Sequence, residues 1–503
     1  MSKSNFLTVL SEEDIQHIHE ATLRVLDEVG LWLPNQEALE ILEGGGAKVD
    51  FEKQIACYPP DMVEKAIQLF PPGFTWHARN PENTIQIDGS RTYFSMPDSA
   101  LNLIDVQGLR RPSQARDGED ICRLCDALPN MAVASTGINP PDMQSGILEA
   151  WHTRTMFCCS SKAVFGVSRK VDMVLEMAQV VADTCDHLPP GVLPLVAIMN
   201  PFSPLHNESD QLGGMITYAR RGVPISISPE VQAGATGPAT LAGSLVQQTA
   251  EFLGHAVLVQ LVNPGLGVLY GTVSSVFDMK KMILPYGAPE ADLLAVGTVQ
   301  MARHYGIPAR NTGGSSDSNS LDMQAGAEAL MSTLLPILSG ASFVLHGAGE
   351  LENTMAVSYE KILIDNELID MARRYARGIE VNPETLAVDV IKEVGCGPKG
   401  QFLQHEHTFQ HFRREQFMPR YLVRDTYQQW EKSGKKQAEH RTLETIKDLL
   451  ATHEPLPLPQ KAQEEIDRIY TRSWREASDH NIEIRSSKFE TNSNDKNSKR
   501  KKS

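Results

Sequence analysis

The stretch NTGGSSDSNSLDMQAGAEAL, residues 311–330, lies where an apolar segment gives way to a helical pattern. It contains three flexible polar steps, Gly313-Gly314, Ser315-Ser316 and Ser318-Asn319-Ser320, and no Cys, His or Lys. Backbone N–H groups and hydroxyls in such a segment can bind a substrate, but they supply neither a nucleophile nor an obvious base. The stretch therefore raises the question of which reaction can proceed without either.

Aromatic and charged side chains close several apolar runs that lead into glycine or small polar residues. They are Tyr93, Phe94, Tyr270, Arg310 and His346. Arg310 directly precedes the Gly-Ser stretch, where it could bind a substrate anion or, equally well, pair with a carboxylate of a neighbouring strand. Tyr270 and His346 each border a glycine, whereas Phe343, in the run that ends at His346, is better explained as packing. These residues are candidates for a site assembled from several strand ends.

Three segments match known reactive motifs only in part. GATGPATLAG, residues 234–243, is rich in glycine but lacks the spacing of a nucleotide-binding loop. Cys122 and Cys125 form a single C-x-x-C with no second pair to complete a zinc site, so we expect a packed helix face. His407 and His411 share a helix face without the H-E-x-x-H order, and we expect hydrogen-bonded or interfacial histidines and no bound metal.

The composition argues against membrane and nucleic-acid partners. The 503 residues carry a formal charge of −16, which would repel a phosphate backbone. No apolar run approaches the roughly 20 residues of a membrane span, and the first residues lack the long apolar stretch of a secretory signal. Seven cysteines in a chain of this length indicate free thiols in a reducing compartment. We therefore expect a cytoplasmic protein.

The order of the predicted elements indicates an α/β fold, a (β/α)8 TIM barrel. Helical patterns alternate with short apolar runs that give seven strands, and TYFSMPD, residues 92–98, can supply an eighth. Strands separated by helices form parallel sheets, and this number and spacing favour a closed barrel whose strand ends gather at one rim. We expect an N-terminal helical and β-hairpin extension over 1–112, the barrel over 113–350, a C-terminal helical region over 351–485 and a disordered polar tail over 486–503.

Several motifs, in this order along the chain, resemble the trimethylamine methyltransferase family. They are AGATGPATLAG, VLYG, ARNTGGSSDS with QAGAE, and SGASFVLHGAGELE with SYEKILIDNE. The resemblance extends from the N-terminal helices to RSW near residue 474. It implies a (β/α)8 barrel that passes a methyl group from a small amine to the cobalt(I) of a corrinoid carried by a separate cognate protein. We also expect a homo-oligomer.

The chain departs from the archaeal founding members of this family at one position. Those members carry pyrrolysine on the barrel rim, and it would be expected here near Asn319 and Ser320, where the sequence reads DSNSLDMQAG. The chain therefore resembles the non-pyrrolysine branch, which demethylates quaternary amines. The implied substrate is glycine betaine, which gives dimethylglycine. A quaternary nitrogen leaves as a neutral tertiary amine and cobalt(I) is the nucleophile, so the stretch at 311–330 needs no reactive group.

A bulky cation at the rim requires aromatic faces and negative charge. Each aromatic ring over a cation contributes roughly 0.5–2 kcal/mol, depending on desolvation. Tyr93, Phe94 and Tyr270 are the candidates for this contact. Asp317 and Glu230 would balance the charge of the ammonium group.

The carboxylate of a betaine requires donors at the same rim. Arg310 is one candidate, and the backbone N–H groups of Gly313 and Gly314 are others. His346 and Asp317 are the catalytic candidates, and His346 would either orient the substrate or approach the corrinoid.

Other functions fit parts of this pattern. The same chemistry could act on proline betaine, carnitine, γ-butyrobetaine or choline, and choline has no carboxylate for Arg310 to bind. A barrel that binds or senses betaine without turnover is an alternative of another class, as is a barrel with unrelated lyase or isomerase chemistry. Formation of methylcobalamin separates these alternatives, because neither a binding protein nor a cobalt-independent enzyme would produce it.

Overall fold

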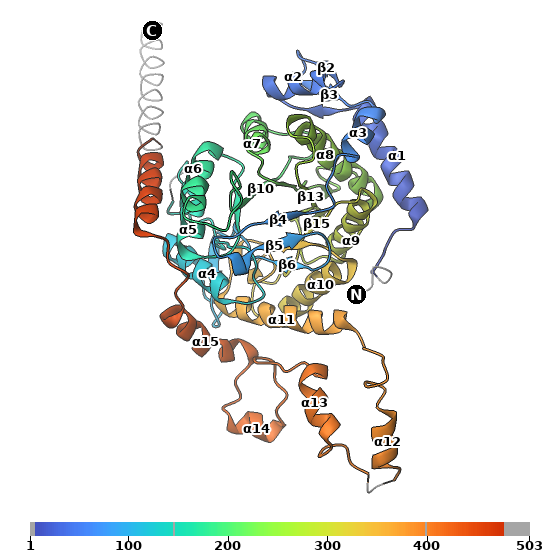
Figure 1. The fold of residues 1–503 in the computed structure, drawn as a ribbon, viewed down its shortest axis with the longest axis vertical. Helices are drawn as coiled ribbons and strands as arrows, with labels where there is room; N and C mark the ends of the chain where they lie inside the picture. The colour runs from blue at the N-terminus through green and yellow to red at the C-terminus, as the bar shows by residue number, and fades with distance from the viewer. Residues whose placement is uncertain (1–5, 144–145, 398–399, 477–503) are drawn as a thin grey trace, which may run out of the picture.

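The centre of the molecule is a parallel β-barrel in the computed structural model, which describes residues 6–143, 146–397 and 400–476 (Figure 1). Seven strands pair in the order β6-β16-β15-β13-β11-β10-β9. Their bounds are β6 Tyr93–Phe94, β9 Val164–Gly166, β10 Leu195–Met199, β11 Ile225–Ile227, β13 Val268–Gly271, β15 Ala309–Thr312 and β16 Phe343–Leu345. Residues 131–133 close the ring, since Met131 bridges to Phe94 and Val133 to Ala163, both in parallel. The predicted (β/α)8 fold is confirmed.

A helix follows each of the eight barrel segments and returns the chain to the start of the next strand. These helices are α4 Ala115–Ala127, α5 Leu148–Cys159, α6 Val171–Ala182, α7 Ser209–Arg220, α8 Leu241–Val262, α9 Pro289–His304, α10 Met323–Ser339 and α11 Tyr359–Arg377. Local signals set the ends of α10: the Asp322 side chain accepts from the Ala325 N–H, and Gly340 ends the helix at a φ of +87°.

Two barrel elements lie outside the range 113–350 that we assigned to the barrel. Strand β6 lies in TYFSMPD, the segment predicted to supply an eighth strand, although the same residues fall within the bounds 1–112 given to the N-terminal extension. Helix α11 falls in the predicted C-terminal region, because its outer face is charged. It nevertheless packs against α10 as the eighth barrel helix. The predicted tail at 486–503 lies outside the described residues.

The N-terminal residues cover one side and one end of the barrel. Helices α1 Glu12–Glu28, α2 Gln36–Gly44 and α3 Pro60–Ile67 pack on α8, and a small antiparallel sheet joins β1 Leu31–Trp32, β3 Ile55–Cys57 and β2 Lys48–Asp50. The hairpin β4 Phe74–Trp76 and β5 Ile85–Ile87 carries Trp76, which is fully buried. Its indole N–H donates to the Val164 carbonyl at 3.0 Å, and its ring meets Phe343 edge-on at 5.2 Å. Trp76 and Phe343 therefore pack together at the bottom of the barrel interior. This agrees with the expectation that Phe343 has a packing role.

Short strands form a second layer over the C-terminal ends of the barrel strands. One sheet has the order β17-β18-β7-β8, with bounds β17 Glu350–Leu351, β18 Ala356–Val357, β7 Asn102–Ile104 and β8 Arg110–Pro112. A parallel pair, β12 Gln232–Ala233 and β14 Ser275–Val276, extends two other barrel loops. These pairings hold the loops of the rim against one another.

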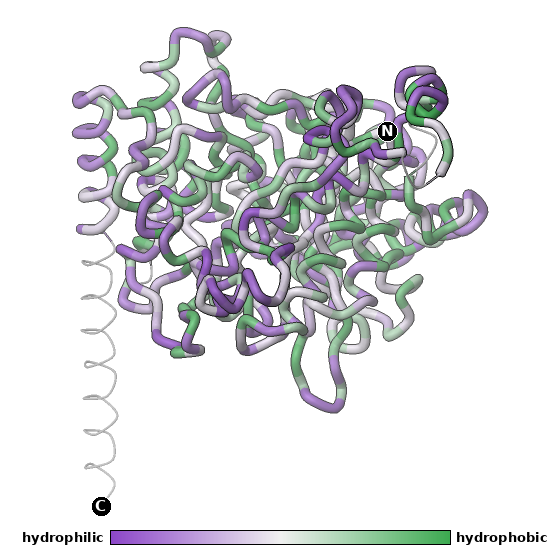
Figure 2. Tube along the Cα trace, turned by 90° about the horizontal axis from the view of Figure 1, so that it is seen from below, coloured by the Kyte–Doolittle hydropathy of each residue, from purple (hydrophilic) through white to green (hydrophobic). Residues whose placement is uncertain are grey.

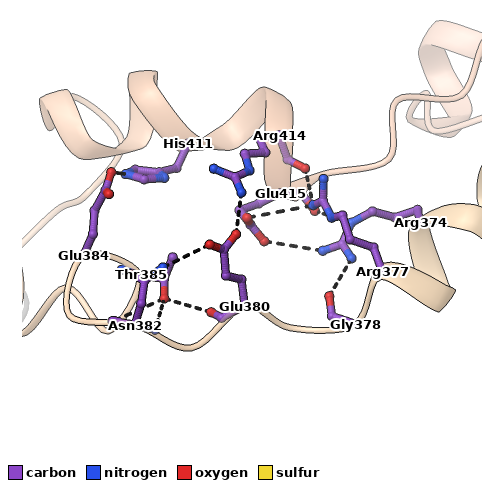
Figure 3. Close-up of polar contacts among 10 residues, drawn as sticks. All are labelled: Arg374, Arg377, Gly378, Glu380, Asn382, Glu384, Thr385, His411, Arg414 and Glu415. Carbon is purple, nitrogen blue, oxygen red and sulfur yellow. Dashed lines mark hydrogen bonds and ion pairs between the residues drawn. The ribbon is translucent and has the colours of Figure 1, made fainter. Parts of the chain in front are cut away.

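Beyond α11 the chain leaves the barrel, and residues 378–437, which we call the arm, extend away from it (Figure 1). The arm contains α12 Val388–Val394, α13 Glu406–Glu415 and α14 Tyr427–Lys432, and the chain returns through α15 Ala438–Thr452 and a helix at 460–476. Arg414 pairs with Glu380, and Arg374 and Arg377 of α11 pair with Glu415 (Figure 3). These ion pairs fasten the two limbs of the arm to the end of α11.

Hydrophilic and hydrophobic residues alternate over short distances along the trace (Figure 2). Within the described residues, no helix is both long enough and apolar enough to span a bilayer.

Candidate active site

The C-terminal parts of four barrel strands, together with the loop after β14, bring polar and charged side chains into one buried or half-buried group, the rim group. Its members are Asp98 after β6, Glu230 after β11, Tyr286 after β14, Arg310 on β15, and His346 and Glu350 after β16. Arg310 is 1% exposed, and one terminal nitrogen donates to the Thr272 carbonyl at 2.9 Å, whereas Nε has no partner among the described residues. Burial lowers the pKa of Arg310 to about 10, although nearby carboxylates oppose this shift. Arg310 is therefore a cation at neutral pH.

His346 and Glu350 form a buried pair beside this cation. The His346 Nδ1 lies 2.6 Å from Glu350 Oε1, and the Ser315 hydroxyl donates to Glu350 Oε2 at 2.9 Å. The pKa of the His346 imidazole is raised. Burial alone would lower it, but the attraction of the Glu350 and Asp98 carboxylates for the protonated ring is larger than the effect of burial. His346 also adopts a φ of +67°, a region that side chains rarely occupy. The turn after β16 thus aims the ring at the rim group.

Tyr286 supplies the aromatic ring of this group. Its hydroxyl donates to Glu230 at 2.8 Å, and its backbone N–H donates to Asp317 at 2.9 Å. The neighbouring Gly287 N–H donates to the same Asp317 oxygen at 3.2 Å. Burial raises the pKa values of both the Tyr286 phenol and the Asp317 carboxyl. Asp317 therefore positions the loop that carries Tyr286, and the phenol stays neutral.

A buried ion pair beneath the group positions two of its loops. Lys361 and Asp365 on α11 lie 2.6 Å apart and are both almost fully buried. Lys361 also donates to the Gly314 carbonyl at 3.0 Å, and Asp365 accepts from the Gly349 N–H at 2.8 Å. The pair therefore fixes the loop after β15 against the loop that carries His346.

Gly313 and Gly314 lie where two rim loops approach each other closely. The Gly313 N–H donates to the Leu345 carbonyl at 3.1 Å. A Cβ on Gly314, at a φ of +66°, would lie 2.5 Å from the Gly347 backbone, and one on Gly313 would lie 2.5 Å from the Ser332 carbonyl. The glycines allow this close approach, and the engaged N–H of Gly313 removes that residue from the carboxylate-binding candidates.

The three aromatic residues expected to hold the cation lie away from the rim group. The Tyr270 ring stacks on Phe252 of α8 at 4.0 Å, and its hydroxyl bonds to Thr249 at 2.8 Å, behind the strand. Phe94 is fully buried in the cluster between the barrel and the outer helices. Tyr93 begins β6 at the opposite end, with the Arg91 guanidinium 5.5 Å from its ring. This placement removes all three from the candidate site.

The structure brings Arg310, His346, Glu230 and Asp317 to one region, as their positions after strands suggested. Sequence reasoning missed Asp98, Glu350 and Tyr286. Asp98 ends the segment TYFSMPD and Glu350 follows HGAG, so both were close to residues already singled out. Tyr286 lies in a loop without periodicity, and no signal in the sequence identifies it.

Three further buried side chains lie outside the rim group and have structural roles. Cys122 and Cys125 are buried on α4 in the core, as expected. His152 on α5 is bonded through both ring nitrogens, to Thr136 and Asn139 at 2.7 Å each, and burial lowers its pKa to about 4. It is a neutral residue that orders the loop after residues 131–133.

The rim group contains no thiol and no free lysine amine. The seven cysteines lie in the N-terminal extension, in α4 and α5, after α6 or in the arm. The amine of Lys361 is held by Asp365 and Gly314. Carboxylates outnumber the cations, so the region favours a positively charged substrate. The geometry thus defines a (β/α)8 barrel with a predominantly acidic group of side chains at the C-terminal ends of its strands.

Comparison with known proteins gives the family: the chain belongs to the trimethylamine methyltransferase (MTTB) family, whose model matches residues 1–477. It is 34% identical over 451 residues to a glycine betaine methyltransferase of Desulfitobacterium hafniense, with 89% of this chain and 93% of the relative covered. It is 36% identical over 459 residues to a trimethylamine methyltransferase MttB of the same species, with 90% and 92% covered.

The similarity extends to archaeal proteins and to a solved structure. The trimethylamine methyltransferase MttB of Methanosarcina thermophila is 32% identical over 464 residues, with 90% of this chain and 94% of the relative covered. The crystal structure of the Methanosarcina barkeri monomethylamine methyltransferase MtmB covers 95% of this chain and 96% of its own at 13% identity and a TM-score of 0.46.

Proposed function

We propose that this methyltransferase moves a methyl group from glycine betaine to the cobalt(I) of a corrinoid held by a separate protein, and so releases dimethylglycine. The observation that carries the proposal is a rim group with several carboxylates, one guanidinium and no thiol. Its acidic surroundings suit a quaternary ammonium group, and its single guanidinium suits a carboxylate on the same molecule. A relative that is 34% identical bears the name glycine betaine methyltransferase.

The nature of the leaving group favours a quaternary amine over trimethylamine. Protonated trimethylamine is a poor methyl donor, since its lone pair is occupied by the proton. A quaternary nitrogen departs as a neutral amine and requires no acid at the moment of transfer. Cobalt(I), when the corrinoid protein docks, supplies the nucleophile. The barrel residues then need only bind the donor, align one methyl group and exclude water.

The residues of the rim group divide into two halves in this proposal. Tyr286 presents its ring to the ammonium group, while Glu230 and Asp98 balance its charge. Arg310 and the protonated form of His346 bind the carboxylate. Glu350 holds the His346 ring in its unusual backbone position.

A panel of methylated amines tests the substrate. Purified protein is mixed with reduced cobalamin and either glycine betaine, proline betaine, carnitine, γ-butyrobetaine, choline or trimethylamine, and methylcobalamin is followed by absorbance. We expect the highest rate with glycine betaine. Methyl transfer from trimethylamine with inert betaines would contradict the proposal.

Choline provides a second comparison, because it lacks the carboxylate. Arg310→Lys should raise the KM for glycine betaine by about tenfold or more, since the fork of donors is lost, and should leave any slow turnover of choline unchanged. Equal effects on the two substrates would assign Arg310 a structural role only. Betaine binding without methylcobalamin would instead favour a non-catalytic binding barrel.

We also propose that the arm joins two copies of the chain. Among its described residues only Tyr421 is buried, and apolar side chains such as Ile379 and Leu403 are 88% and 78% exposed. The arm carries nine Lys or Arg and eight Asp or Glu, a formal charge of +1, so the rest of the chain carries −17. A neutral, apolar projection can contact a second copy without the repulsion that the acidic bodies would experience.

Sedimentation of the full-length protein tests this arrangement. We expect a dimer or a larger even assembly at micromolar concentration, and the variants Leu403→Glu and Phe409→Glu should dissociate it. Leu69→Glu, a partly exposed position after α3, is the matched control. A monomeric wild-type protein, including one that assembles only with a corrinoid protein, would contradict the proposal.

A further inference from the structure

A cavity of about 670 Å³ opens at the end of the barrel opposite the rim group. It lies against the starts of β15 and β16 and the segment before β6, and it is bordered by the end of α11. The side chains that matter for its chemistry are Arg91, Arg303, Arg373, Arg377, Asp88 and Ser342. None of the rim group lines it, so the cavity is separate from the proposed methyl-transfer site.

Four guanidinium groups in one cavity are unexpected in a chain of formal charge −16. Among the described residues, no carboxylate lies within ion-pair distance of Arg91, Arg303 or Arg373. Arg377 has a distant partner, Glu415, at 3.8 Å. The only acidic residue among the side chains that line the cavity is Asp88, whose carboxylate accepts from the Ser90 N–H. The cavity is therefore electropositive.

The arginines are held in place by uncharged groups. Arg373 donates to the Asn130 side chain and, at 3.2 Å, to the Thr92 carbonyl. Arg303 donates to the Ser339 carbonyl at 2.5 Å, and its guanidinium lies 4.4 Å from the centre of the Phe6 ring. These contacts orient the guanidinium groups, and the carboxylates of Asp370 and Glu12 act on Arg373 and Arg303 only from beyond ion-pair distance.

The charges also repel one another. Burial and the nearby Arg91 together lower the pKa of Arg373 to about 10, although Asp370 opposes this shift. An anion in the cavity would relieve this repulsion, since it would sit between guanidinium groups of which three have no carboxylate within ion-pair distance in the described part of the chain.

Ser342 provides an independent indication of a ligand. It is fully buried, it lines the cavity, and its hydroxyl has no hydrogen-bond partner among the described residues. Its backbone is engaged, with the N–H bonded to the Ala309 carbonyl. A buried hydroxyl without a partner costs free energy, and an oxyanion in the cavity would accept from it.

We propose that this cavity binds a small molecule that carries phosphate. Guanidinium groups bind phosphate oxygens through paired, charge-assisted hydrogen bonds, and a group of charge near −2 matches several arginines better than a single carboxylate does. The volume falls within the range of small-molecule sites, so there is room for the organic part of such a ligand. This inference does not depend on the proposed methyl transfer.

Calorimetric titration with pyrophosphate and with ATP, each at low and moderate salt, tests the proposal on the full-length protein. We expect saturable binding that weakens with salt. The double variant Arg91→Gln/Arg303→Gln should weaken it by about tenfold or more, as expected for lost charge-assisted hydrogen bonds, and Ser342→Ala should weaken it less. Arg169→Gln/Arg472→Gln, two exposed arginines paired elsewhere, should bind like the wild type.

Three results would overturn the inference. They are absence of binding by both phosphate compounds, an equal loss of binding in the control variant, and binding of citrate in preference to either phosphate compound. Methyl transfer by Arg91→Gln/Arg303→Gln should remain at the wild-type rate, so a failure of the phosphate site is distinguishable from a failure of the rim site.

Discussion

The two ends of the barrel carry charge of opposite sign. At the C-terminal end, carboxylates surround Arg310, and at the N-terminal end, arginines surround Asp88. The same two strands, β15 and β16, reach both ends. The formal charge of −16 describes neither end, because the local surroundings of each strand end decide which ion can bind there.

The ends also differ in how firmly their charged groups are held. Rim residues are buried or half-buried and bond to one another, as His346 does to Glu350 and Tyr286 does to Glu230. The arginines at the other end bond to carbonyl and amide oxygens and line an open cavity. Substitutions at the rim should therefore disturb a prearranged network, while those at the other end should change only the binding of an anion.

The largest effect is expected beneath the rim. Lys361→Met should lower the free energy of unfolding by about 3–5 kcal/mol, because it leaves the buried Asp365 carboxylate without its partner. Denaturant unfolding measures the change, and Lys361→Met/Asp365→Leu should be more stable than the single variant. A single variant as stable as the wild type would show that the pair does not fix the rim loops.

Glu350→Gln should lower kcat/KM for betaine by about 100-fold, since the amide cannot hold a protonated His346. Steady-state kinetics measure this effect, and thermal melting of the same sample checks that the fold persists. Glu352→Gln, two residues further on and paired with the exposed Arg110, is the matched control and should retain activity. If the two variants were equally active, the buried carboxylate would contribute no more to catalysis than the exposed one, and the prediction would be wrong.

Tyr286→Phe should have a smaller effect on betaine kinetics. It separates the role of the phenol hydroxyl from that of the aromatic ring. The ring remains to face the cation, while the bond to Glu230 is lost, so KM should rise by about 3- to 10-fold with little change in kcat. Tyr286→Leu, which removes the ring, should raise KM further. If the two variants behave alike, the ring does not contact the substrate.

Asp292, a buried carboxyl on α9 near Tyr286, should make the stability of the folded protein depend on pH. Burial raises its pKa to about 7, so between roughly pH 4 and 7 the folded state retains a proton that the unfolded state has lost. Its contribution to stability therefore falls as pH rises through this window. Asp292→Asn should remove that decline, as measured by the difference in melting temperature from the wild type at each pH. An unchanged difference across the window would contradict the assignment.

The sequence predicts the barrel well and the site only in part, for a physical reason. Alternation of helix and strand is a local pattern, and it places Arg310 and His346 at the same end of a parallel sheet. Whether a strand residue faces inward depends on its register, so Tyr270, one position before the end of its strand, faces α8 while Arg310 faces the rim. Tyr286 reaches the rim through a loop anchored by Asp317, and no periodic pattern records such a contact.

The central claim is a single methyl transfer from a quaternary amine to cobalt, with the protein as a positioning device. Glycine betaine labelled with 13C in its N-methyl groups, mixed with the enzyme and a reduced corrinoid protein, tests it most directly. We expect one labelled methyl group on cobalt for each dimethylglycine formed, and no labelled enzyme by mass spectrometry. A methylated enzyme residue that forms before the methylated corrinoid would contradict the claim.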